Sequence, residues 1–158
     1  MLKLDDRDLA ILRVLSTDGR ITKAQLAERV GLSASPCWER LRKLEDAGVI
    51  EGYHARLNLK KLGPHVTVFV AAELADHTPA SFRSFEESVQ HYQEVTACWA
   101  LGGGFDYLMQ IVTTDIDSYQ RLIDEMLEAR IGLARYFTYI VTKPVKSPSM
   151  PPIAELAE

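Results

Sequence analysis

The stretch Thr22–Gly48, TKAQLAERVGLSASPCWERLRKLEDAG, predicts two short helices joined by a tight turn. Thr22 is followed three residues later by Gln25, a capping-box pattern that satisfies free backbone N–H groups at a helix start. Gly31 is placed where this first helix of the pair would end, because glycine readily adopts the positive φ of a helix C-cap. The pattern therefore favours a helix from Thr22 to about Val30.

The second helix of the pair is expected to begin at Pro36, with Ser35 as its cap. Proline suits the first helical position, where its fixed φ and missing N–H cost nothing. Leu41 and Leu44 would supply the buried face of this helix, and Gly48 would end it. A separation of only a few residues between the two helices is typical of a helix-turn-helix.

The flanking sequence extends this unit in both directions. Asp6–Leu15 carries apolar residues along one helical stripe, so it predicts a preceding helix. Partial alternation over Val49–Leu57 indicates a short two-stranded wing. Leu59–Pro64 ends in Gly-Pro and is interpreted as a linker. We therefore expect a winged helix-turn-helix domain over residues 1–63.

From Val66 onward the pattern changes to buried strands alternating with amphipathic helices. Strands are expected over residues 66–74, 95–101, 107–113 and 135–142, and helices over residues 78–90 and 116–129. The order β-α-β-β-α-β predicts a ferredoxin-like domain over residues 64–145, with both helices on one face of an antiparallel sheet. The other face would be left bare in a monomer, so the chain is expected to form a homodimer. The Pro-rich residues 143–152 are expected to be extended, within a C-terminal arm over 146–158.

The composition is that of an α+β globular protein of 158 residues, with 47% hydrophobic and 25% charged residues. No run of 18 apolar residues occurs, and the start of the chain is acidic rather than typical of a signal sequence. A cytoplasmic location is therefore expected. Cys37 and Cys98 have no neighbouring ligands at metal-binding spacing, so reduced thiols are expected rather than a disulfide or zinc site.

Charge is distributed unevenly along the chain, although the net charge is only −4. Residues 1–63 contain 12 Lys and Arg against 9 Asp and Glu, whereas residues 64–158 contain 6 against 13. The first part is thus +3 and the second −7. This asymmetry favours two domains, with any polyanionic partner bound by the first.

Over nearly its full length the chain resembles the Lrp/AsnC family of bacterial and archaeal transcription regulators. The motifs that carry the resemblance are Asp18–Ile21 (DGRI), Leu26–Ser33 (LAERVGLS), Pro36–Leu41 (PCWERL), Leu44–Ile50 (LEDAGVI) and Phe105–Leu108 (FDYL). The resemblance implies a helix-turn-helix over roughly Lys23–Arg42 that binds double-stranded DNA. It also implies a C-terminal domain that binds an amino acid or related metabolite, and dimers that commonly assemble further, often to octamers. Members of the family often have a polar or acidic residue where this chain has Gly104.

The candidate DNA contacts lie around the second helix of the pair. Cys37, Trp38 and Arg42 are predicted to read bases, since arginine can bind guanine bidentately. The predicted backbone-positioning residues are Ser33, Ser35, Arg40 and Lys43, and Lys23 and Pro36 complete the interface. Three other interpretations remain open: Arg40 and Lys43 as a solvated helix face paired with Glu39 and Glu45, Trp38 packed on a neighbouring helix, and Cys37 as a small filler or a redox switch.

The second candidate site is the loop Gly102-Gly103-Gly104 and the strand that follows it. Glycines expose backbone N–H groups and permit positive φ, so main-chain donors could hold a carboxylate. Asp106 could bind the ammonium group of an amino acid, and Trp99, Phe105 and Tyr107 could line the pocket around its side chain. The alternative is a glycine-rich hairpin in which Asp106 satisfies its own turn. No Lys-Ser/Thr pair follows the glycines, so they do not form a phosphate loop.

Two other functional classes compete with that of a DNA-binding regulator. An enzyme is disfavoured because the four histidines, His54, His65, His77 and His91, are scattered without a nucleophile or metal partner at recognisable spacing. A module that binds protein through its N-terminal domain is disfavoured, mildly, by the basic surplus of residues 1–63. No catalytic residue, cofactor, metal or membrane partner is expected.

Overall fold

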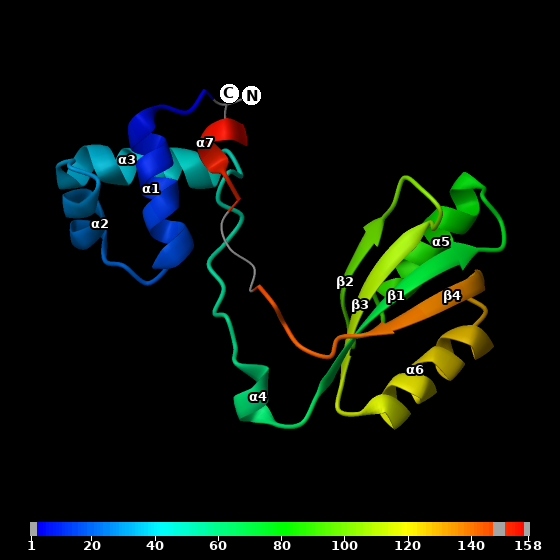
Figure 1. Ribbon diagram of the computed structural model, residues 1–158. Coiled ribbons are helices and arrows are strands. Elements are labelled where there is room, and N and C mark those ends of the chain that lie inside the picture. The colour runs from blue at the N-terminus through cyan, green and yellow to red at the C-terminus, as the bar shows by residue number, and fades with distance from the viewer. Residues whose placement is uncertain (1–2, 147–150, 157–158) are drawn as a thin grey trace. The chain divides into compact units, whose positions relative to one another are not determined.

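The protein is described by a computed structural model covering residues 3–146 and 151–156. The described residues form two compact units, one built from residues 3–56, 146 and 151–156 and the other from residues 57–145 (Figure 1). Each unit has its own hydrophobic core. Within the described ranges, no helix is long and apolar enough to cross a membrane.

Three helices form the first unit: α1 (Asp6–Thr17), α2 (Lys23–Arg29) and α3 (Ala34–Asp46). The α1 helix begins with a capping box between Asp5 and Asp8. The capping box predicted for α2, between Thr22 and Gln25, is present. The inward faces of the three helices meet in a core whose fully buried side chains include Ile11, Leu26 and Leu44.

The turn between α2 and α3 depends on Gly31, which has a φ of 64°. After this turn, Ser33 and not Ser35 occupies the N-cap position of α3, so the predicted start of this helix was wrong by two residues. Pro36 then falls in the first turn rather than at the first helical position. The first four N–H groups of a helix have no internal acceptor, so a proline is tolerated there as well.

The predicted two-stranded wing is absent from the first unit. Within the described part of the chain, residues 49–57 form no strand and pair with none. The segment is instead attached to α3 by Tyr53, whose hydroxyl donates to Glu45 Oε1 at 2.9 Å. The residues interpreted as a linker contain a single helical turn, α4 (Leu59–Leu62), which belongs to the second unit.

The second unit has the predicted β-α-β-β-α-β order: β1 (Val66–Leu74), α5 (Pro79–Val89), β2 (Val95–Ala100), β3 (Tyr107–Thr113), α6 (Ile116–Glu128) and β4 (Leu133–Ile140). The four strands form one antiparallel sheet in the order β2-β3-β1-β4. Thr78 and Asp115 cap α5 and α6 through their side-chain oxygens. The ferredoxin-like architecture is therefore confirmed.

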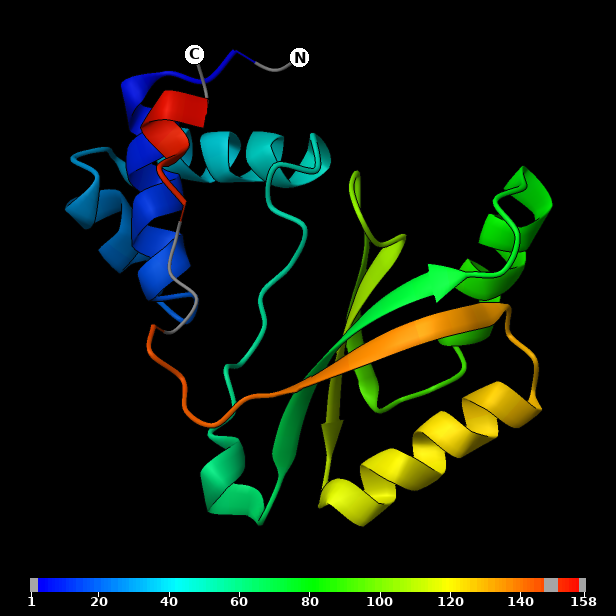
Figure 2. The same cartoon turned by 45° about the vertical axis from the view of Figure 1, so that its right-hand side comes forward.

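One face of the sheet carries both helices (Figure 2). Val70 from β1 and Met109 from β3 are fully buried against Phe85 of α5 and Ile123 of α6. Strand residues alternate between faces, so this apolar set lies on one side of the sheet. Burying each of these side chains contributes roughly 1.5–3 kcal/mol to folding. This core supports the loops at the sheet ends.

The opposite face of the sheet has no helix of its own unit on it. Register places Trp99, Leu108, Ala71 and Phe137 in one row across all four strands. Trp99 is 46% exposed and Phe137 40%, and Tyr139 on β4 of the same face is 54% exposed. We call this aromatic surface the open face.

After β4 the chain has no regular secondary structure through residue 146, with a bend at residues 145–146. Part of the predicted arm, residues 147–150, lies outside the described residues. A last helical turn, α7 (Ile153–Leu156), belongs to the same unit as α1 to α3.

Candidate functional site

The α3 helix presents two faces with opposite character. Cys37, Leu41 and Leu44 point into the core of the first unit. Because an α-helix has 3.6 residues per turn, the residues opposite these, Ser35 and Arg42, point outward and are exposed. This outward side is the surface that a helix-turn-helix presents to a major groove.

The prediction that Cys37 reads bases was wrong. Its side chain is 2% exposed and packs between the helices, where it cannot reach DNA without unfolding the unit. Burial also raises the pKa of the Cys37 thiol, so the reactive thiolate is disfavoured. Of the interpretations left open, a small apolar filler agrees with this position, and a redox switch does not.

Trp38 lies at the edge of the outward face and is 39% exposed. Lys23, the first residue of α2, places its ammonium Nζ 3.0 Å from the centroid of the Trp38 ring. This cation–π contact holds the indole against α2 while leaving part of it open to solvent. Lys23 and Trp38 thus lie side by side on the surface that α2 and α3 form together.

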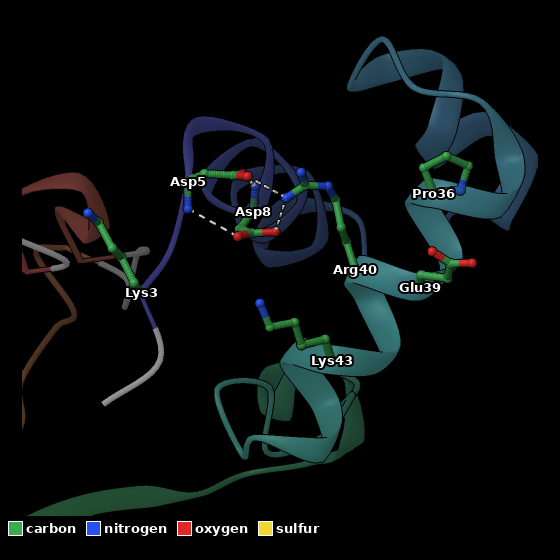
Figure 3. A pocket seen from close by; sticks show the side chains of 7 residues that line it. All are labelled: Lys3, Asp5, Asp8, Pro36, Glu39, Arg40 and Lys43. Carbon is green, nitrogen blue, oxygen red and sulfur yellow. Dashed lines mark hydrogen bonds and ion pairs between the residues drawn. The ribbon is translucent and has the colours of Figure 1, made fainter.

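Arg40 lies on the other side of α3 and points back to the start of α1 (Figure 3). Its Nη1 donates to Asp5 Oδ2 at 2.6 Å and to Asp8 Oδ1 at 2.8 Å. These hydrogen bonds to Asp8 and Asp5 raise the pKa of the Arg40 guanidinium, which stays charged. The predicted role of Arg40 in holding phosphate stays a prediction, but the guanidinium already pairs with two carboxylates of the first unit, and neither of them is Glu39.

An open hollow of about 410 Å³ adjoins this ion pair. The residues that line it are Lys3, Asp5, Asp8, Pro36, Glu39, Arg40 and Lys43 (Figure 3). Three of these are basic and three acidic, so the hollow has no net preference for an anion. Lys43 and Pro36 line it from α3, and Lys43 is exposed.

Two long-range contacts that orient the helices of the first unit were not predicted from the sequence. One is the Arg40 pair with Asp5 and Asp8. The other joins Arg7 of α1 to the end of α2, through a hydrogen bond from Nη1 to the Val30 carbonyl. The only local feature of the sequence at these positions is the capping box of Asp5 and Asp8. It indicates the start of a helix but does not identify Arg40 as the distant partner of the two carboxylates.

In the second unit, the other predicted site residues lie in the loop between β2 and β3 or in the adjoining ends of these strands. Asp106 Oδ2 accepts hydrogen bonds from Leu74 N at 2.8 Å and His77 Nε2 at 3.1 Å. Asp106 therefore fastens the loop to the end of β1 and does not satisfy its own turn. A carboxylate accepts about four hydrogen bonds, so this anchored group still has acceptor capacity for a ligand.

The three glycines of this loop adopt ordinary backbone conformations. None of Gly102, Gly103 and Gly104 has a φ in the left-handed region, so the positive φ that glycine permits is not used there. A Cβ added at any of the three would meet no heavy atom within 4 Å. Packing within the described chain thus does not require glycine at these three positions. Their backbone is open to an approaching molecule.

The three aromatic residues predicted to line the pocket are divided between the two faces of the sheet. Tyr107 is 3% exposed, with its ring centroid 4.5 Å from that of Phe85 and its hydroxyl bonded to Glu86 at 2.8 Å. It is a core residue and cannot line a pocket beside Trp99, which corrects that prediction. The ring centroid of Phe105 lies 5.3 Å from that of Phe137, with the ring planes tilted by 59°, so Phe105 lies with Trp99 on the open face.

Comparison with known proteins agrees with both units. Residues 4–51 match the winged helix-turn-helix DNA-binding model, and residues 67–151 match the Lrp/AsnC ligand binding domain. The chain is 59% identical over 148 residues to the transcriptional regulatory protein DoeX of Halomonas elongata, covering 94% of each. It is 41% identical to the leucine-responsive regulatory protein of Escherichia coli, covering 90% of this chain and 87% of that protein.

Solved structures include a transcriptional regulator from Neisseria meningitidis, crystallised as a complex with L-Met. It superposes with a TM-score of 0.90 at 34% identity, covering 97% of this chain and 99% of that one. The matches span both units and nearly the whole of each relative. The chain is a member of the Lrp/AsnC family: a transcriptional regulator, not an enzyme, with a DNA-binding helix-turn-helix and a ligand-binding domain.

Proposed function

We propose that the protein binds DNA sequence-specifically as a homodimer, and that an amino acid or related metabolite bound at the loop Gly102–Asp106 changes its DNA occupancy. The observation that carries the ligand site is the open backbone of Gly102–Gly104 beside the anchored Asp106. Backbone N–H groups suit a carboxylate, and a carboxylate suits an ammonium group, so the pair fits the two ends of an α-amino acid.

The DNA contact is proposed to use the outward side of α3. Arg42 has a side chain that is 71% exposed and only a loose ion pair, at 3.7 Å, with Asp46. Its guanidinium is available for the edge of a guanine. Trp38 and Ser35 lie beside it, and Lys23 and Lys43 flank the helix as phosphate contacts. Ser33 caps the same helix and Pro36 lies in its first turn, so both act at the end that approaches DNA.

The homodimer is proposed to form through the open face. A row of exposed aromatic side chains on a sheet is costly in water and is rare on monomeric proteins. Two copies related by a twofold axis would cover the same surface on each other. Two helix-turn-helix units would then meet two DNA half-sites about one helical turn, or a multiple of it, apart. Further assembly to octamers follows from the family and would bring ligand loops of different dimers together.

A thermal-shift screen of the proteinogenic amino acids tests the ligand proposal. A ligand that binds only the folded state raises its unfolding temperature. We expect one or a few amino acids to raise it in the wild type but not in Gly103→Val, whose added side chain would occupy the space above the loop. Gly63→Val is the matched control, because Gly63 also has open space and an extended backbone. An equal response in all three proteins would refute the site.

A further inference from the structure

The centre of the outward side of α3 is an acidic residue. Glu39 lies four residues after Ser35 and three before Arg42, so these three side chains share one helical stripe opposite Cys37 and Leu41. Glu39 is exposed. Any contact of this helix with a major groove brings the Glu39 carboxylate toward the DNA together with Arg42.

The Glu39 carboxylate is not used by the fold. No hydrogen bond or ion pair of the described residues involves it, whereas the other acidic groups near α3 all have partners. Asp5 and Asp8 hold Arg40, Glu45 holds the Tyr53 hydroxyl, and Asp46 lies 3.7 Å from Arg42 Nε. Lys43 is four residues further along but makes no ion pair with Glu39 within the described chain. The carboxylate is therefore free to accept hydrogen bonds from another molecule.

An unpartnered carboxylate on a surface that approaches a polyanion is repelled by phosphate. That cost is offset where the carboxylate meets hydrogen-bond donors on a base edge. In the major groove, cytosine presents the N4 amino group as a donor without an adjoining acceptor, and glutamate accepts from it. Guanine, in contrast, presents only acceptors on its own edge, which suit the arginine one turn further along α3.

We propose that Glu39 is a specificity-determining residue that accepts a hydrogen bond from the N4 amino group of a cytosine in each half-site. This inference rests on the proposed docking of α3 in the major groove. Glu39 contributes base selection rather than affinity. The phosphates of every duplex repel its carboxylate, and only a duplex with a hydrogen-bond donor at that position offsets the repulsion. Arg42 supplies the complementary preference for guanine.

The test is selection of binding sites from a library of random duplexes, using the full-length wild type, Glu39→Gln, Glu39→Ala and Arg42→Ala. Glu28→Gln on α2 is the matched control for losing one exposed carboxylate from the same unit. The wild type should select a cytosine at one position of each half-site. Glu39→Gln should switch that position to adenine, because glutamine binds adenine N6 and N7 bidentately. Glu39→Ala should lose the preference, and Glu28→Gln should keep it.

Direct affinities then give the size of the effect. Changing the selected cytosine to thymine should weaken wild-type binding about tenfold or more, and leave Glu39→Ala unaffected. Unchanged base preferences in both Glu39 variants, or a uniform tightening on all duplexes, would overturn the proposal. If Arg42→Ala alters a preference while the Glu39 variants do not, only the role of Glu39 fails. If Arg42→Ala is also without effect, the docking of α3 fails as well.

Discussion

Arg40 on α3 and Asp8 on α1 form an ion pair of 2.8 Å between Nη1 and Oδ1, although 32 residues separate them along the chain. The Asp8 side chain is only 7% exposed and that of Arg40 33%. Asp5 shares the same guanidinium nitrogen at 2.6 Å. The orientation of α3, the helix proposed to face DNA, is therefore fixed by contacts with the start of α1.

Removing the guanidinium should destabilise the first unit. Arg40→Ala leaves Asp8 buried without its partner, and the expected loss in the free energy of unfolding is about 2 kcal/mol after allowing for solvent around Arg40. Urea unfolding followed by Trp38 fluorescence in a Trp99→Phe background reports on this unit alone. Unchanged stability together with weaker DNA binding would show that Arg40 serves phosphate instead.

Arg42→Ala is the contrasting change on the same helix. Its side chain is 71% exposed, so stability should fall by less than about 0.5 kcal/mol. Binding to the preferred duplex should weaken by about 1–3 kcal/mol, with relaxed preference at a single position. Equal weakening on every duplex would mean that Arg42 contacts phosphate only. Affinities measured on a panel of single-base variants distinguish these outcomes.

Replacing Lys23 tests two roles of its ammonium group, which are the positioning of the Trp38 ring and the attraction of DNA phosphate. Lys23→Met keeps much of the side-chain length but removes the cation that lies 3.0 Å from the Trp38 ring centroid. We expect a stability loss of about 0.5–1 kcal/mol, a changed Trp38 emission, and a salt dependence of DNA binding lower by about one unit. Lys23→Arg should restore the salt dependence. A variant with the wild-type emission spectrum would contradict the contact.

Charge on the open face should separate the subunits. Phe137→Glu places a carboxylate in the proposed interface, and the dimer should dissociate because the charge would be buried without a partner. Leu127→Glu on α6 is the matched control, since Leu127 is 41% exposed and Phe137 is 40%. Light scattering after gel filtration measures the mass of each. A dimer that survives Phe137→Glu but not Leu127→Glu would place the interface on the helical side.

Alkaline pH should weaken the second unit through Tyr107. Burial, aided by the hydrogen bond to Glu86, raises the pKa of its phenol from 10.0 to about 12. The folded pKa lies above the unfolded one, so this stabilisation is complete below pH 10 and is lost as pH rises toward 12. Tyr107→Phe should flatten the decline of unfolding free energy in this window. Burial also raises the pKa of Tyr92 and Tyr119 in the same unit, so an identical decline in the variant would assign the effect to them instead.

Local sequence patterns predicted most of this fold, because the residues of each helix or strand themselves carry the signal for that element. The Thr22 capping box, the alternation of β1 and the stripe of α6 are signals of this kind, and the β-α-β-β-α-β order then determined the architecture. The prediction of a wing was wrong because a strand needs a second strand to pair with. The alternation over residues 49–57 was partial, and nothing in it specified a pairing strand.

The site was less predictable because its decisive contacts are distant in sequence. Cys37 is the exception, because it lies four residues before Leu41 and seven before Leu44, so helical periodicity alone places it on their buried face whichever serine caps α3. Leu74 and Asp106 are 32 residues apart, and no local feature joins them. Tyr107 and Trp99 both looked suitable for a pocket until strand register placed them on opposite faces.

The most direct measurement is the DNA affinity of the full-length protein as a function of the amino acid that raises its unfolding temperature most. Fluorescence anisotropy with a duplex chosen by the wild type gives the dissociation constant at each ligand concentration. We predict a shift of about fivefold or more at saturation for the wild type and for Gly63→Val, and none for Gly103→Val. A wild-type affinity that stays constant at saturating ligand, or a full response in Gly103→Val, would contradict control of DNA binding through the Gly102–Asp106 loop.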